Sequence, residues 1–200
     1  MNLLTKYISL FIFLLPLVSG QDLSKVNKGR QWETIQEGTI TIKTTELDGF
    51  PICQAESVLP YQINRISALI ENIENYPNIF LRVTESTVFN DDVAHIVLDM
   101  PFPFSDRDYV IQYFKQKSGD EWMFRFKAVA DTDFPSSDKY VRLIHATGEW
   151  KLSIISKNQT KVSYIWNGEL LGDFPDWALE RAWVTQGNEM IDWLGNALKN

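Results

Sequence analysis

Few side chains in this sequence are placed to do acid–base, nucleophilic or metal chemistry. The two histidines, His95 and His145, lie far apart, and no serine or cysteine near them has the spacing of a nucleophilic triad. One thiol, Cys53, allows no internal disulfide, and with two histidines it makes a structural zinc site improbable. The chain also lacks a glycine-rich phosphate loop, an HExxH motif and a paired-carboxylate motif. We assign no catalytic residue, metal or cofactor, and expect a protein that is not an enzyme.

Arg107 is the charged side chain with a possible role in ligand recognition. It stands between Asp106 and Asp108, so one interpretation is an ordinary ion pair that stabilises a turn or strand end. The alternative is contact with a phosphate, because the guanidinium fork can donate two hydrogen bonds to one such group. The sequence leaves both interpretations open.

Aromatic residues are the most prominent feature of the composition. The chain has 12 Phe, 7 Tyr and 7 Trp, and so many rings need either a large core or a large lined cavity. The residues that we expect to line such a cavity, beside Arg107, are Tyr109, Ile111, Tyr113, Trp122, Phe124, Phe126, Tyr164, Trp166, Trp183 and Met190. Ordinary core packing is the alternative for each of them.

Strands are expected to position most of these rings. Residues 39–45 and 52–59 form a predicted hairpin around Asp48-Gly49. Further strands are predicted at 81–89, 93–100, 108–116, 121–130, 140–147, 149–155 and 161–169. The short turns between several of them indicate antiparallel neighbours. Alternation places Trp122, Phe124 and Phe126 on one face of the sheet and Arg125 on the other.

Three helices are predicted. A weak one covers residues 22–32, and a second runs from Pro60 to residue 75, ended by Asn75-Tyr76-Pro77. The third begins at Pro175, with an apolar stripe formed by Leu179, Trp183, Gly187, Met190, Ile191, Leu194 and Leu198. Its opposite, polar side carries Glu180, Arg181, Asn188, Glu189, Asp192 and Asn196. We predict an α+β fold in which a curved antiparallel sheet surrounds this C-terminal helix; a lipocalin barrel is disfavoured by the helix at 60–75.

Charge and the N-terminal segment limit the partners and the compartment. The net charge is −7, which argues against a nucleic-acid partner and a polybasic membrane patch. Residues 1–20 have the layout of a secretory signal peptide, with Lys6, an apolar run over 7–15 and small residues at Ser19-Gly20. The run is shorter than the ~20 residues of a membrane span, which disfavours an uncleaved anchor. We expect cleavage after Gly20 and a single exported domain, residues 21–200, that is periplasmic or secreted and monomeric.

Four segments in register resemble one protein family. They are residues 100–110 (MPFPFSDRDYV), Val141-Arg142 with residues 148–150 (GEW), residues 162–166 (VSYIW), and residues 172–177 (GDFPDW). Together they resemble the START (steroidogenic acute regulatory protein-related lipid transfer) domains, most closely the members similar to phosphatidylcholine-transfer protein. The likeness covers residues 32–198.

The resemblance implies a helix-grip fold around a tunnel for one lipid or other hydrophobic molecule, with the C-terminal helix as its lid. It places Arg107 where the phosphatidylcholine-binding branch has a head-group contact. It also places Tyr113 where cholesterol-type members carry an arginine, which disfavours a sterol held by their ion pair. The implied function is lipid binding or transfer, with transient membrane contact through the C-terminal helix or the loop over residues 101–104. The alternatives are a cyclase/aromatase-like enzyme of the same superfamily and an interaction module with a collapsed cavity.

Overall fold

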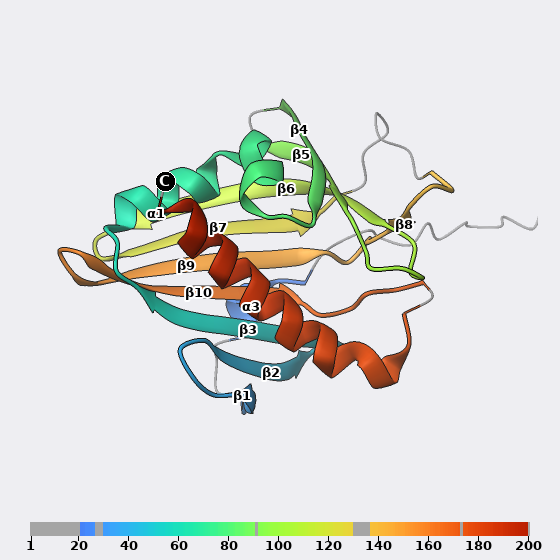
Figure 1. Ribbon diagram of the computed structural model, residues 1–200, viewed down its shortest axis with the longest axis horizontal. Coiled ribbons are helices and arrows are strands. Elements are labelled where there is room, and N and C mark those ends of the chain that lie inside the picture. Colours follow the sequence, from blue (N-terminus) through green and yellow to red (C-terminus); the bar gives the residue numbers. More distant parts are fainter. Residues whose placement is uncertain (1–20, 27–29, 91, 130–136, 173, 200) are drawn as a thin grey trace, which may run out of the picture.

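A computed structural model describes residues 21–26, 30–90, 92–129, 137–172 and 174–199. Within these ranges ten strands form one sheet in the order β1-β2-β3-β10-β9-β7-β6-β5-β4, and β8 pairs with β6 (Figure 1). Neighbours on the main path are antiparallel, whereas β8 runs parallel to β6. The strands are β1 (Glu33–Gln36), β2 (Thr41–Leu47), β3 (Phe50–Leu59), β4 (Val83–Asn90), β5 (Val93–Leu98), β6 (Arg107–Ser118), β7 (Glu121–Ala128), β8 (Val141–Arg142), β9 (Thr147–Ser156) and β10 (Gln159–Asn167).

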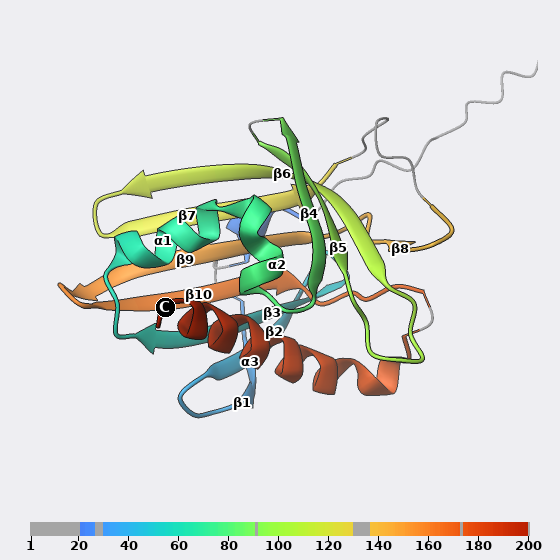
Figure 2. The same ribbon diagram turned by 45° about the horizontal axis from the view of Figure 1, so that its top comes forward.

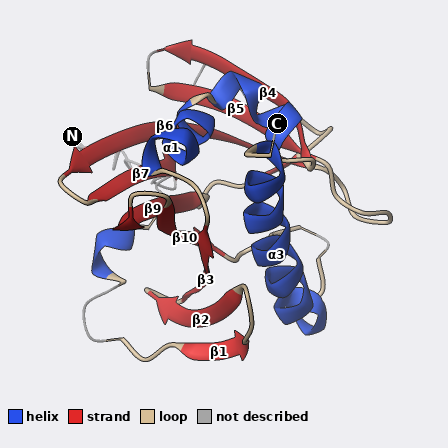
Figure 3. Ribbon diagram, turned by 60° about the vertical axis from the view of Figure 1, so that its left-hand side comes forward, coloured by secondary structure: helices blue, strands red, loops and turns tan. Residues whose placement is uncertain are grey.

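The sheet curves around a long helix at the C-terminal end, as Figures 1 and 2 show. This helix, α3 (Leu179–Ala197), follows the short 3₁₀ turn η3 (Asp176–Ala178). The helices α1 (Ile63–Glu71) and α2 (Tyr76–Ile79), joined by η2 (Ile73–Asn75), lie on the same side of the sheet as α3 (Figure 3). A separate 3₁₀ turn, η1 (Leu23–Lys25), stands near the start of the described chain. The predicted curved antiparallel sheet with a long C-terminal helix is confirmed.

Helix α3 approaches the sheet closely at one glycine. A Cβ atom at Gly187 would come within 2.9 Å of Ile42 Cδ1 and 3.2 Å of the Trp166 ring. Ile191 and Leu194 continue the buried stripe of α3, and Ile66 and Ile70 bring α1 into the same core. The inner face of the sheet is therefore the apolar one, as alternation predicted.

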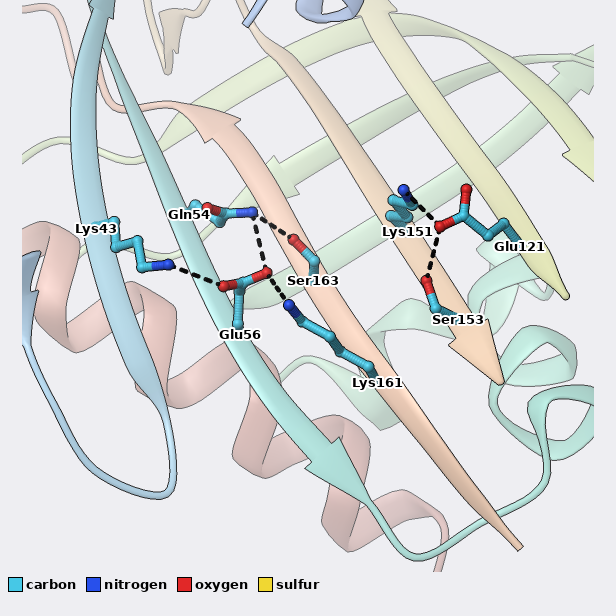
Figure 4. Close-up of polar contacts among 8 residues, drawn as sticks. All are labelled: Lys43, Gln54, Glu56, Glu121, Lys151, Ser153, Lys161 and Ser163. Atoms are coloured by element: carbon cyan, nitrogen blue, oxygen red, sulfur yellow. Dashed lines mark hydrogen bonds and ion pairs between the residues drawn. The ribbon is translucent and has the colours of Figure 1, made fainter. Parts of the chain in front are cut away.

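The outer face carries charged and polar side chains in cross-strand contacts (Figure 4). Glu56 lies between Lys43 and Lys161, whose Nζ atoms are 3.2 and 2.8 Å from its carboxylate. Lys151 pairs in the same way with Glu121, at 2.8 Å. Such pairs keep one side of the sheet polar while its other side packs around α3.

Several predicted boundaries were wrong. The helix over 60–75 is α1 followed by η2, and the chain then enters α2, where Pro77 lies in the first turn. Proline is tolerated there because the first amides of a helix have no intrahelical acceptor. The strand over 140–147 is only Val141–Arg142, and a 3₁₀ turn over Leu23–Lys25 replaces the helix over 22–32. The predicted signal peptide lies outside the described residues. Within them, no helix is long and apolar enough to cross a membrane.

Candidate functional site: a ring-lined cavity beneath helix α3

A cavity of about 410 Å³ lies between the concave face of the sheet and α3. A volume of this order is typical of small-molecule sites. Of the residues predicted to line it, the structure places these on its wall: Tyr109, Tyr113, Phe126, Tyr164, Trp166 and Met190. The cavity wall also includes rings that the prediction missed, Tyr76, Phe80, Trp150 and Trp193.

The other predicted lining residues lie elsewhere. Ile111 and Phe124 are buried in the core cluster, and Trp122 packs at its edge with Lys117 over its ring. The Trp183 indole donates a hydrogen bond of 2.8 Å to the Gly168 carbonyl, at the joint between β10 and the loop that leads to α3. Strand alternation gave Ile111, Trp122 and Phe124 the correct face, but the core fills the parts of that face that the cavity does not reach.

The rings form a nearly continuous wall across the sheet. Trp150 contacts Tyr164 at 4.3 Å between centroids, and Tyr164 stacks on Trp166 at 5.1 Å. On β7, Phe126 faces Gly148 of β9, where a Cβ atom would lie only 2.3 Å from the ring. Glycine at 148 thus lets the Phe126 ring lie against β9 and form part of the wall.

Two phenols in the cavity form a short hydrogen-bond chain. Tyr113 Oη donates to Tyr76 Oη at 3.3 Å, and Tyr76 Oη donates to the Ile70 carbonyl at 2.7 Å. Burial raises the pKa of both phenols. The nearby Tyr76 and Tyr109 phenols raise the pKa of Tyr113 further. Both are therefore neutral at physiological pH. Cholesterol-type members of the family that the sequence resembles carry an arginine at the position of Tyr113. In this protein the position contributes a neutral hydroxyl group to the cavity instead.

An ion pair joins the two sides of the cavity wall. Arg82, just before β4, donates from Nε and Nη2 to both carboxylate oxygens of Glu189 on α3, at 2.6 and 2.8 Å. This contact raises the pKa of the Arg82 guanidinium. Both side chains line the cavity, as does Arg181. The prediction that Glu189 lies on the polar side of α3 was wrong, because the cavity extends to this side of the helix and half-buries Glu189. Arg181 reaches the rim of the cavity but is exposed, as predicted.

Arg107 is fully buried and holds two loops together. It donates to the Leu170 and Leu171 carbonyls at 3.2 and 2.9 Å and to the Ser105 carbonyl. It is not among the described residues of the cavity wall. Head-group contact through Arg107 therefore stays a prediction, and the geometry shows instead a link between the β5–β6 loop and the segment leading to α3.

The interpretation that Arg107 forms an ion pair with Asp106 or Asp108 is wrong, because within the described residues both carboxylates bind other groups. Asp108 instead accepts two hydrogen bonds from Arg142, at 2.8 and 2.6 Å, and contacts His95 Nε2 at 2.9 Å. Asp106 accepts from the Met100 amide. Burial opposes the charged form of Asp108, but Arg142 and His95 outweigh it and lower the pKa of the carboxyl.

The second histidine lies beside the cavity. His145 Nδ1 is 2.8 Å from Glu169 Oε2, and Glu169 is part of the cavity wall. Within the described residues, the side chains hydrogen-bonded to the two imidazoles are carboxylates, Asp108 for His95 and Glu169 for His145, and no serine, threonine or cysteine side chain bonds to either. Cys53 is buried, and burial raises the pKa of its thiol, which fits a packing role.

One end of the cavity carries large exposed rings. Phe102, in the β5–β6 loop, is 97% exposed, and Trp177, in η3, is 87% exposed. In the same two segments, Phe104 contacts Phe174 at 4.6 Å between ring centroids, and both line the cavity with Trp177. The β5–β6 loop thus meets the segment that leads into α3 (Figure 2). We call this region, Pro101–Phe104 with Phe174 and Trp177, the cavity mouth.

The sequence matches the START domain family over residues 74–189, more than half of the chain. The chain belongs to the START domain family. This matched region contains β4 to β10 and most of α3, so it supplies most of the cavity wall.

Several solved structures share the fold. A STAR-related lipid transfer protein from Xanthomonas axonopodis aligns with a TM-score of 0.74 at 20% identity, covering 84% of this chain and 99% of that one. Human StAR-related lipid transfer protein 5 aligns with a TM-score of 0.76 at 13% identity, covering 88% and 90%. The Zhui aromatase/cyclase of Streptomyces sp. R1128 aligns less well, with a TM-score of 0.51 at 12% identity over 74% of this chain and 93% of that one.

Among curated proteins, the chain is 32% identical over 80 residues to the uncharacterized protein PA1579 of Pseudomonas aeruginosa. The match spans 40% of each protein. Proteins that share the fold therefore include two named for lipid transfer and one named as an aromatase/cyclase. The helix-grip fold predicted from the sequence is the one observed.

Proposed function

We propose that this protein is an exported, non-enzymatic lipid carrier that holds one lipid or other hydrophobic molecule beneath α3. The observation that carries the proposal is the ring-lined cavity of about 410 Å³. A hydrophobic molecule in water carries an unfavourable free energy of roughly 25 cal/mol for each Å² of apolar surface. Enclosure in an apolar cavity removes that cost during transit between membranes.

Loading requires the cavity to open, and the mouth is the part built for contact with a membrane. Phe102 and Trp177 expose large rings there, and aromatic side chains favour the interface between lipid and water. We propose that the protein touches the membrane transiently with the mouth, and that α3 moves away from the β5–β6 loop. The signal-peptide pattern of residues 1–20 supports export, where the carrier acts as a monomer.

A vesicle assay tests this function. Donor vesicles carry a fluorescent phosphatidylcholine with a quencher, and acceptor vesicles carry neither, so transfer appears as a rise in fluorescence. Ala182→Trp fills the cavity from α3 and should lower the protein-dependent rate at least tenfold. Asn196→Trp adds the same ring at an exposed position of α3 and should leave the rate unchanged. Equal rates in both variants, with unchanged melting temperatures, would show that transfer does not use the cavity.

A cyclase-like enzyme is the second candidate, and the observation that favours it is the His145–Glu169 pair beside the cavity. Glu169 could accept a proton from a bound substrate while His145 orients it. Glu169→Gln would then abolish turnover of a bound compound without emptying the cavity. Persistence of an unaltered ligand in the wild-type protein favours the carrier. The interaction module with a collapsed cavity is disfavoured by the open volume.

A further inference from the structure

We propose that the cavity recognises a neutral oxygen atom of its ligand through the hydroxyl groups of Tyr109 and Tyr164. The preferred ligand is then a hydrophobic molecule with a carbonyl, ester or alcohol group held against these phenols, rather than one with a charged group there. This inference rests on the proposed carrier function and adds the chemical class of the ligand.

The hydrogen bonds of the cavity leave these two hydroxyls unused. Tyr76 donates its proton to the Ile70 carbonyl, and Tyr113 donates its proton to the Tyr76 hydroxyl. Among the described residues, neither Tyr109 Oη nor Tyr164 Oη has a hydrogen-bond partner, although both side chains line the cavity. A phenol is both a donor and an acceptor, and buried polar groups normally have partners. Two donors are therefore available to a ligand.

A third donor lies beside them. The Trp166 indole stacks on Tyr164 with 15° between the ring planes, and its Nε1 atom is buried with no partner among the described residues. Tyr164 and Trp166 are two residues apart on β10, so both project from the same face of the sheet. This part of the wall therefore has more donors than protein acceptors. The indole N–H is closed off, so the two phenol hydroxyls at the cavity are the donors that a ligand oxygen would reach.

The electrostatics favour a neutral group. Burial raises the pKa of the Tyr109 and Tyr164 phenols, and neighbouring phenols add to the effect, so both hydroxyls are neutral donors. The described cavity wall carries no lysine. Of the two arginines on the described cavity wall, Arg82 is bound to Glu189, and Arg181 is exposed on α3. An anion at the phenols would be desolvated without a counter-ion, which is unfavourable.

Calorimetric titration with three ligands of similar chain length tests the inference. Methyl octyl ketone, decanoate and decyltrimethylammonium differ mainly in the polar group. The ketone should bind wild-type protein at least tenfold more tightly than either ion. Tyr109→Phe and Tyr164→Phe should each weaken ketone binding by up to about tenfold, the value of one hydrogen bond. Neither variant should weaken binding of the two ions.

Tyr61→Phe is the matched control, because Tyr61 packs against the core outside the cavity wall. It should leave all three affinities unchanged. Melting temperatures should be equal or higher in the two cavity variants, since each loses an unpaired hydroxyl. Tighter binding of either ion, or ketone affinity that survives both substitutions, would overturn the inference and leave the carrier function standing. Failure of all three ligands to bind wild-type protein would contradict the carrier function as well.

Discussion

Arg82 and Glu189 form a two-point ion pair that ties the start of β4 to the middle of α3 across the cavity wall. The arginine side chain is 33% exposed and the glutamate side chain 24%, so water screens the pair only in part. At Gly187, α3 packs against Ile42 of β2, near one edge of the sheet. The Arg82–Glu189 pair links the same helix to the start of β4, the strand at the other edge. A lid that opens on this side must break it.

Glu189→Gln should therefore speed ligand exchange. It keeps the shape of the side chain but removes the charge, and the expected loss of stability is only about 1 kcal/mol because the pair is partly exposed. We expect a several-fold rise in the rate of transfer between vesicles. Asp192→Asn changes an exposed carboxylate on the same helix and should have no effect. An unchanged rate in Glu189→Gln would show that the helix does not open on this side.

Asp108 should be essential for stability. It is 2% exposed and neutralises Arg142, whose side chain is 15% exposed. Asp108→Ala leaves a mostly buried arginine without this partner and should lower the free energy of unfolding by about 3 kcal/mol or more. Denaturant melts measure the loss, with the exposed Asp120→Ala as the control. A change below about 1 kcal/mol would mean that water reaches the Arg142 guanidinium.

Glu56 should contribute stability that acid removes. Burial opposes its charged form, yet Lys161 and Lys43 outweigh burial and lower its pKa in the folded protein. In the unfolded chain, Glu56 therefore binds a proton at a higher pH than it does in the folded protein. Its contribution to the free energy of unfolding is complete above the pKa of the unfolded state and is lost as the pH falls through the pKa of the folded state. Glu56→Gln should cost up to about 1 kcal/mol at pH 7 and less as the solution is acidified. A cost that is constant with pH would contradict the assignment.

Two glycines of α3 should respond to alanine in opposite directions. A Cβ atom at Gly187 would press on Ile42, Ala55 and Trp166, so Gly187→Ala should destabilise the protein by about 1–3 kcal/mol. A Cβ atom at Gly195 meets only Leu59, at 3.9 Å, so Gly195→Ala should stabilise it by about 0.5–1 kcal/mol through helix propensity. Thermal melts of the two variants compare them directly. Equal shifts would mean that α3 does not rest on the sheet at Gly187.

Local patterns were enough to predict the sheet and the long helix. Alternation along β7 and β10 identifies the inner face because side chains on a strand alternate regularly, and the stripe on α3 follows the helical repeat. The predicted strand at 140–147 failed because β8 is defined by its parallel pairing with β6, a contact that no local pattern encodes. The spacing predicts a helix over 60–75 that ends before Pro77, but proline also begins helices, and α2 contains Pro77 in its first turn.

The cavity was less predictable than the fold. The curvature of the sheet decides which inward-facing side chains line the open volume and which fill the core. Tyr109 lines the cavity, whereas Ile111, two residues further along the same face, is buried in the core. The Arg82–Glu189 pair joins residues 107 positions apart, and the loop contacts of Arg107 come from backbone carbonyls 63 and 64 positions away. Such contacts leave no signal in local spacing.

Native mass spectrometry of the protein, purified without detergent, tests the central claim most directly. The account predicts a discrete mass above that of the polypeptide, which organic extraction releases as a lipid or other hydrophobic compound. Ala182→Trp should lose this mass, whereas Asn196→Trp should keep it. A bare polypeptide mass in the wild-type protein, with no uptake after incubation with phospholipid vesicles, would contradict the claim that the cavity beneath α3 carries a ligand.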